Sequence, residues 1–423
     1  DLANQADSTV DVLFGKTLSY SGGALHIGSH ALTLTGGGTL TNSNELVLND
    51  PDSVLKLDGI SQISKVGVSG VLIGGKLSVA QNALIGALSH SGSSRLDLAD
   101  GVHLSVDEAF EVPVTRLMEL IGTGGTLTLN ETLTLSGTLK FSAPGNTLDN
   151  GTLILTGGSV QRWEGKNLVS ISEVAYILVD DNTTIASDIR HLSDSTVSVG
   201  SGKTLTYTGA ELEIGARTLT LTGGGTFENT DNLTLDDPTS VLKLAGIVQV
   251  SKVAVRADNL TDGVLEVDGD TIIQTLLQLG SSRLDIANGK RLSVRDAFEV
   301  LSGHSLALVG TGGGTLALQD NLTVSGTLRF EAPATVDNGT VSLDDGIVEA
   351  LANAAISSRL VNLRDGSLQV AAGRTLALSG GEVPIGASSM QLSGGGEIAN
   401  DDPVVLDTSD SILKLSGTQL QRL

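Results

Sequence analysis

Residues 15–40 read GKTLSYSGGALHIGSHALTLTGGGTL, and this stretch decides the fold because it returns twice further along the chain. Residues 202–227 read GKTLTYTGAELEIGARTLTLTGGGTF, and residues 373–398 read GRTLALSGGEVPIGASSMQLSGGGEI. The match continues downstream as SVLKLDG, SVLKLAG and SILKLSG, beginning at Ser53, Ser240 and Ser411. Long internal repeats of this kind are the signature of repeat architectures.

A finer rhythm runs through each copy. Residues 31–35, 126–129 and 132–135 alternate apolar and hydroxyl side chains, which is the period of a half-buried strand. Glycine, Asn or Asp interrupts the pattern every five to eight residues, as at Gly36-Gly37-Gly38 and Asn150-Gly151. The pattern therefore predicts many short strands joined by tight turns. No sustained helical face is present.

Short strands with tight turns suit either a series of sandwiches or a solenoid. The chain has 423 residues but only three Tyr, six Phe and one Trp, and no cysteine. A solenoid interior is narrow and accepts rows of Leu, Val and Ile, whereas a sandwich core usually holds larger rings. We therefore predict an all-β parallel β-solenoid. Leu18, Leu32 and Leu34 are expected to point inward, and so are their counterparts Leu205, Leu219 and Leu221.

The copies divide the chain into residues 1–193, 194–364 and a partial third copy, 365–423, within one continuous solenoid. The stretch from Asp149 to Asp194 is 17 residues longer than its counterpart from Asp337 to Asp365. A loss of that size suggests that copy two lacks one coil, meaning one full turn of the solenoid. Trp163 lies in the extra stretch and is not expected in the core. Both termini interrupt the series, so we expect them to continue or to stack on neighbouring chains.

The net charge of −23 restricts the partners. A chain this acidic is repelled by phosphate backbones and by anionic membrane surfaces, so neither nucleic-acid binding nor membrane insertion is expected. The absence of cysteine excludes a disulfide framework and a thiolate metal site.

The phrases ALTLTGGGTL (residues 31–40) and LTVSGTLRF (residues 322–330) resemble secreted bacterial β-helix proteins. Autotransporter passengers and filamentous-haemagglutinin-like adhesins belong to this group. The resemblance covers most of the chain in style. It implies a cysteine-poor extracellular or cell-surface rod that acts in adhesion, biofilm or fibre formation. The implied partners are further copies of the chain, end to end, and cell-surface or matrix polymers.

Acidic turns are the candidate metal sites. Two acids precede or surround a proline at corresponding places in each copy, just before the SVLKL-type stretch, and such crowded oxygen ligands could hold Ca²⁺. The alternative is that Asp before Pro only starts a turn. The six candidate ligands are Asp50, Asp52, Asp236, Asp237, Asp401 and Asp402.

Other polar motifs favour a scaffold over catalysis. Arg95 precedes Asp97 by two positions, as Arg283 precedes Asp285, which suggests an exposed ion pair along one strand. No catalytic residue and no cofactor is expected. The six histidines share no metal-ligand spacing and are expected to face solvent; they are His26, His30, His90, His103, His191 and His304.

The function predicted from these patterns is a non-enzymatic structural or adhesive module of an extracellular bacterial fibre. Two alternatives stay open. A carbohydrate-active β-helix enzyme needs clustered carboxylates and rings in a groove. A protein that binds ice or a mineral surface needs a regular outward array of Thr or Asp. The spacing of Thr pairs in this chain is irregular.

Overall fold

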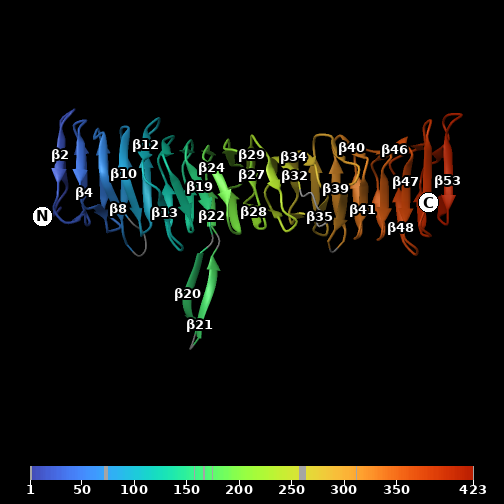
Figure 1. Ribbon diagram of the computed structural model, residues 1–423, viewed down its shortest axis with the longest axis horizontal. Coiled ribbons are helices and arrows are strands. Elements are labelled where there is room, and N and C mark those ends of the chain that lie inside the picture. Colours follow the sequence, from blue (N-terminus) through green and yellow to red (C-terminus); the bar gives the residue numbers. More distant parts are fainter. Residues whose placement is uncertain are drawn as a thin grey trace. The chain divides into compact units, whose positions relative to one another are not determined.

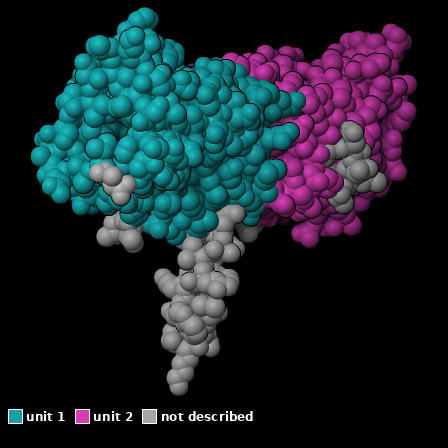
Figure 2. Space-filling view, turned by 60° about the vertical axis from the view of Figure 1, so that its left-hand side comes forward, with its two compact units in different colours: residues 1–212, 224–227 teal, residues 213–223, 228–423 magenta. Residues whose placement is uncertain are grey.

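A computed structural model describes residues 2–70, 75–156, 158–164, 167–173, 175–256, 263–310 and 312–422, and only the backbone of 158–164, 167–173 and 422. The chain forms two compact units: Asp1–Leu212 with Gly224–Phe227, and Glu213–Gly223 with Glu228–Leu423. Figure 2 shows the two units in different colours. The single continuous solenoid stays a prediction.

Each unit is a parallel β-solenoid whose coils carry up to three short strands, one on each face (Figure 1). The strands of each face pair in parallel from coil to coil. Successive partners on the first face include Leu77 with Leu96 and Leu96 with Leu120, so these two coils take 19 and 24 residues. The predicted fold class is confirmed.

In the first unit the three faces are built as follows. The first face contains β1 (Ser8–Asp11), β4 (Ala31–Thr35), β7 (Val54–Asp58), β9 (Lys76–Val79), β11 (Ser94–Leu98), β14 (Leu117–Leu120), β17 (Thr138–Phe141), β22 (Ala175–Val179) and β25 (Ser195–Val199). The second contains β2 (Thr17–Tyr20), β5 (Thr39–Asn42), β8 (Gln62–Val68), β10 (Ala83–His90), β12 (His103–Val106), β15 (Thr126–Leu129), β18 (Thr147–Asp149), β23 (Thr183–Ile185) and β26 (Thr204–Tyr207). The third contains β3 (Leu25–His26), β6 (Leu46–Leu48), β13 (Phe110–Val112), β16 (Thr132–Leu135), β19 (Thr152–Leu155) and β24 (Asp188–His191).

The second unit repeats this plan. The first face contains β28 (Thr218–Thr222), β31 (Val241–Ala245), β33 (Gly263–Val267), β35 (Ser282–Ile286), β38 (Ser305–Val309), β41 (Thr327–Phe330), β44 (Ile347–Ala350), β47 (Gly366–Val370), β50 (Ser389–Ser393) and β53 (Ile412–Ser416). The second contains β32 (Gln249–Val255), β34 (Thr271–Gln278), β36 (Arg291–Val294), β39 (Gly314–Leu318), β42 (Ala334–Asp337), β45 (Ala354–Ile356), β48 (Thr375–Leu378), β51 (Glu397–Asn400) and β54 (Gln419–Arg422). The third contains β30 (Leu233–Leu235), β37 (Phe298–Val300), β40 (Asn321–Val324), β43 (Thr340–Asp344), β46 (Arg359–Arg364), β49 (Val383–Pro384) and β52 (Val404–Val405). Two further strands, β27 (Leu212–Glu213) and β29 (Thr226–Asn229), each have residues in both units.

The core of each unit consists of apolar rows that run from coil to coil. Leu34, Leu57, Val79 and Leu98 are in register on the first face and are all buried. The alternation of apolar and hydroxyl residues produces these rows, because successive side chains of a strand point to opposite faces of the sheet. Among the rings, Tyr207 and Phe227 stack inside the first unit with centroids 6.4 Å apart.

Five of the six leucines predicted to face inward are buried: Leu32, Leu34, Leu205, Leu219 and Leu221. The prediction for Leu18 is wrong, since 42% of this residue is exposed. Leu18 lies on β2, which pairs with β5 on one side and with no described strand on the other. An inward-facing residue is therefore covered only where coils lie on both sides of it.

The prediction that the extra 17 residues form one coil is also wrong. The extra stretch contains two antiparallel strands, β20 (Gly158–Glu164) and β21 (Asn167–Glu173), which pair only with each other. The flanking coils are direct neighbours, because β17 pairs with β22 and β19 pairs with β24. A hairpin satisfies much of its own backbone hydrogen bonding, so it enters a turn without shifting the coils. Trp163 lies on β20, where the structure describes only the backbone.

The described residues contain no helix. No helical segment capable of crossing a membrane is therefore found among them.

Leu34→Asp should lower the free energy of unfolding by several kcal/mol, about 3–5, because it places an unpaired carboxylate in a closed apolar row. Leu18→Asp is the matched control, since it makes the same change on the exposed first coil and should cost less than about 1 kcal/mol. Urea unfolding followed by circular dichroism measures both. Equal losses would mean that the two leucines share one environment, contrary to their burial.

Candidate functional site

The predicted acidic turn of copy one is a polar corner between two coils. Ser53 Oγ donates to the carbonyl of Gly28 at 2.6 Å and accepts from the N–H of Asp50 at 2.9 Å. Asn49 Oδ1 accepts from the N–H of Gly28 at 3.0 Å, and Asp50 Oδ1 accepts from the N–H of Asp52 at 2.9 Å. Gly28 has a φ of 65°, a conformation that glycine adopts without strain. The side chains therefore satisfy backbone groups that the turn leaves unpaired.

The same corner recurs in the other two copies. In copy two, Ser240 Oγ donates to the carbonyl of Gly215 at 2.7 Å, and Asp236 Oδ1 accepts from the N–H of Gly215 at 2.7 Å. In copy three, Ser411 Oγ donates to the carbonyl of Gly386 at 2.6 Å and Asp407 Oδ1 accepts from its N–H at 2.8 Å. The repeated polar motif is thus a structural cap.

Asp401 and Asp402 do not occupy the corner of copy three. They lie between β51 and β52, whereas the corner acid is Asp407, a few residues before β53. The predicted correspondence of the Asp-Pro turns is therefore wrong in copy three, because the cap depends on an Asx side chain and a serine four residues later. Proline is not part of it.

The structure does not assemble a metal site from these acids. Asp237 Oδ1 accepts from the hydroxyl and the N–H of Thr239 at 2.7 and 2.8 Å, and these bonds lower the pKa of Asp237. In the described ranges, no three His, Asp or Glu side chains converge on a point that could hold a metal ion. Calcium binding at these turns therefore stays a prediction to which the structure adds no further ligand.

Arg95 and Asp97 do not pair with each other. Asp97 Oδ2 accepts from Lys76 Nζ of the neighbouring strand at 3.1 Å, and Arg95 donates to the carbonyl of Pro51 at 3.3 Å. Lys76 is in register with Arg95, and its long side chain reaches diagonally across the two strands to Asp97. In copy two, burial raises the pKa of Asp285, and the charges of Glu266 and Asp268 add to the effect.

Lys243 compensates part of this negative charge. Its Nζ lies 3.0 Å from Glu266 and 2.7 Å from Asp268, and both contacts raise its pKa. Lys243, Glu266 and Asp285 are consecutive members of one outward row on the first face. These charges form a cross-strand row on a sheet, and such pairs stabilise sheets by themselves.

The expectation that all six histidines face solvent is wrong for two of them. His90 is 4% exposed and His191 is 8% exposed. His26 and His103 are exposed, and His30 and His304 are half-buried. Both buried histidines end strands, β10 and β24, at positions that alternate with exposed residues. The period-two alternation of these strands predicts that both histidines point inward. Their polar side chains led to the opposite expectation.

His90 is held neutral inside the first unit. Its Nε2 lies 2.7 Å from Ser94 Oγ. Burial lowers the pKa of His90 to about 4, and the charge of Arg116 acts in the same direction. In copy two, Gln278 and Ser282 stand at the positions of His90 and Ser94. Ser282 Oγ donates to Gln278 Oε1 at 2.9 Å. An uncharged polar pair is therefore what the position requires.

Four threonines form an outward row that the sequence spacing did not indicate. Thr126, Thr147, Thr184 and Thr206 are successive partners on the second face of the first unit and are half-buried. The adjacent outward row changes from Thr128 to Asp149. The regular part is therefore a single row one residue wide.

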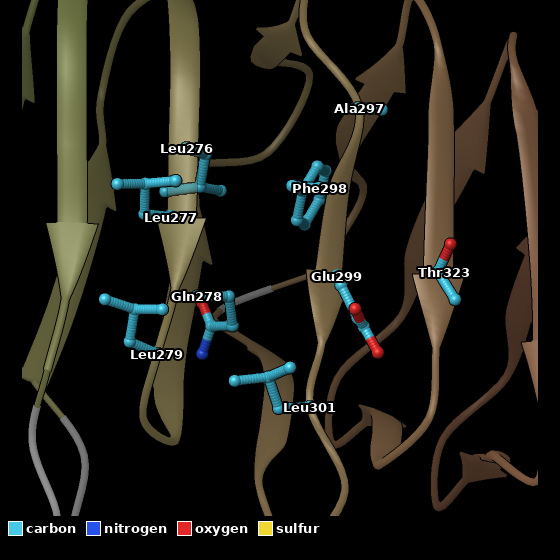
Figure 3. A pocket seen from close by; sticks show the side chains of 9 residues that line it. All are labelled: Leu276, Leu277, Gln278, Leu279, Ala297, Phe298, Glu299, Leu301 and Thr323. Atoms are coloured by element: carbon cyan, nitrogen blue, oxygen red, sulfur yellow. The ribbon is translucent and has the colours of Figure 1, made fainter.

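Figure 3 shows a groove that the sequence did not predict. It lies in the second unit and has a volume of about 400 Å³. The second-face strand β34 supplies Leu276, Leu277 and Gln278, followed by Leu279 in the next turn. Its other wall consists of Ala297, Phe298, Glu299 and Leu301, on or beside the third-face strand β37, with Thr323 of β40.

The groove follows from the way two sheets meet. β34 pairs with β36 only through Thr271–Ile273, and its later residues pair with β32 alone. β37 is the first strand of a separate four-stranded sheet, β37-β40-β43-β46. The end of β34 and the start of β37 therefore lie next to each other without a ladder, and side chains line the gap.

Comparisons with protein-family models, with curated proteins and with solved structures find no match.

Ser240→Ala should lower the free energy of unfolding by about 1–3 kcal/mol, because the buried Ser240 hydroxyl is lost and the carbonyl of Gly215 and the N–H of Asp237 lose their partner. Thr239→Ala is the control in the same turn: its hydroxyl bonds are exposed, so it should cost less than about 1 kcal/mol. Thermal and urea unfolding measure both. A larger loss for the threonine variant would contradict the corner role of Ser240.

His90 should make the protein lose stability as the pH falls from about 6.5 to about 4. The unfolded chain takes up a proton in this window and the folded chain does not, so about 3 kcal/mol is lost across it. His90→Gln, which copies the residue of copy two, should remove that part of the acid sensitivity. The check is the difference in unfolding free energy between the two proteins at pH 7 and pH 4. A difference that is the same at both pH values would show that His90 does not titrate this way.

Proposed function

We propose that this protein is a non-enzymatic structural and adhesive module of an extracellular bacterial surface fibre. The observation that carries the proposal is where the repeated residues lie. The corner serines recur in every copy, and so does one inward leucine of the first face; both hold one coil on the next, and they are Ser53, Ser240 and Ser411, and Leu34, Leu221 and Leu392. A chain that preserves coil-to-coil contacts over long repeats is built to extend a scaffold.

A second support is the apolar surface on the outermost described coils. Leu18 of the first coil is 42% exposed, and Leu415 and Leu420 of the last are 60% and 44% exposed. These residues continue inward rows, since Leu415 is in register with Leu392 and Leu420 with Ile398, which are buried. A further coil, from the same chain or from another copy, would bury them.

The charged residues lie on the outward faces, where their net negative charge repels neighbouring copies of the chain. Arg95, Glu119 and Lys140 are successive partners in one row, and Lys140 lies 3.2 Å from Glu119. In the second unit Arg329 pairs with Glu349 at 2.6 Å. These local pairs leave the net charge of −23 over the whole chain, which opposes side-by-side packing. End-to-end association of copies is therefore the expected assembly, with cell-surface or matrix polymers as further partners.

The purified chain should form end-to-end oligomers that grow with protein concentration and with salt, because salt screens the repulsion between acidic copies. Sedimentation velocity and negative-stain electron microscopy measure this, with and without Ca²⁺. Leu415→Asp should abolish the oligomers, because it places a charge on the apolar end. Leu192→Asp, which changes a residue that is 55% exposed within the first unit, is the control and should leave them intact.

Monodisperse monomers at high concentration and high salt would contradict end-to-end association. Oligomers that survive Leu415→Asp unchanged would place the contact on another surface.

A further inference from the structure

The leucines that line the groove between β34 and β37 occur in copy two and not in copy one. Copy one has the same strands at the same place, but Ser89 and Ser91 stand where copy two has Leu277 and Leu279. All four residues are exposed, and the two leucines are 36% and 43% exposed. Pro113 of copy one likewise corresponds to Leu301 of copy two.

The fold does not require these leucines. Copy one forms the same strands with serines at both positions, and the buried residues beneath them are equivalent: Leu88 with Leu276 and Phe110 with Phe298. Adjacent exposed apolar side chains bring no folding advantage, and in proteins they mark surfaces that bind a partner. The difference between the copies therefore concerns binding.

A carboxylate stands beside this apolar surface. Glu299 is exposed on β37, and its Oε1 accepts from Ser325 Oγ at 2.5 Å (Figure 3). Within the described ranges, no basic side chain forms an ion pair with Glu299. Copy one keeps this arrangement, since Ser136 Oγ donates to Glu111 Oε1 at 2.8 Å. Copy two thus adds an apolar surface to a carboxylate that both copies present.

We infer that this groove binds a polypeptide segment in which a bulky apolar side chain is flanked by Lys or Arg. The volume of about 400 Å³ accommodates a large side chain between Leu277, Leu279 and Phe298. The carboxylate of Glu299 faces the adjoining basic group, and the acidic chain as a whole attracts such a segment. Apolar anchors beside complementary charge are the usual composition of a small recognition site. The site is independent of end-to-end association.

The experiment uses the full chain with ¹³C-labelled leucine methyl groups and two blocked tripeptides, Lys-Trp-Lys and Glu-Trp-Glu. Lys-Trp-Lys should shift the methyl signals of Leu276, Leu277, Leu279 and Leu301, and should bind at least about tenfold more tightly than Glu-Trp-Glu. Glu299→Gln should reduce that preference severalfold without changing the set of shifted signals. Equal affinity for the two peptides would overturn the basic partner.

The paired variant Leu277→Ser with Leu279→Ser restores the residues of copy one and is therefore expected to fold. It should weaken binding of Lys-Trp-Lys at least about tenfold. Leu351→Ser is the matched control, because it removes a residue that is 42% exposed elsewhere in the second unit and should leave binding unchanged. Unchanged affinity in the paired variant, or the absence of shifts at millimolar peptide, would overturn the site.

Discussion

The structure depends on the in-register parallel stacking of one coil on the next. Most strands donate and accept hydrogen bonds on both edges, so an inward position that has a coil on each side is covered by the same position in its neighbours. That geometry permits only apolar side chains in rows such as Leu34, Leu57, Val79 and Leu98, and it leaves little room for large rings. The low aromatic content of the chain is a consequence of this narrow interior.

Corners impose the second constraint, because a tight turn between faces leaves backbone groups without a ladder partner. The serine and Asx side chains of the three corners supply those partners, either within the same turn or to the backbone of the preceding coil, as Asn49 and Ser53 do for Gly28. Three of the six acids that look like metal ligands in the sequence, Asp50, Asp236 and Asp237, therefore accept hydrogen bonds from backbone N–H groups. The same logic explains why a hairpin could be added between β19 and β22 without disturbing either neighbour.

Outward positions are limited neither by the narrow interior nor by the hydrogen bonds of the corners. The residues of the two long copies differ at such positions. Ser89 and Ser91 correspond to Leu277 and Leu279, and the result is an apolar groove in one copy. A buried polar position can vary too, provided that its hydrogen bond is kept, as the replacement of His90 with Ser94 by Gln278 with Ser282 shows. The scaffold thus carries local differences, and we place the binding chemistry of this protein there.

The amino-acid sequence by itself determined the fold class and most of the core. Period-two alternation orients side chains whatever the partner strand is, so Leu32, Leu34, Leu219 and Leu221 were predictable as buried. Only the tertiary structure decided what depends on neighbouring coils. Leu18 is exposed because it has a coil on one side only, and Asp97 forms its ion pair with Lys76 of the neighbouring strand. The tertiary structure also opened the groove beside Glu299, because that gap arises where two sheets part, and no local pattern in the chain records the distance between strands.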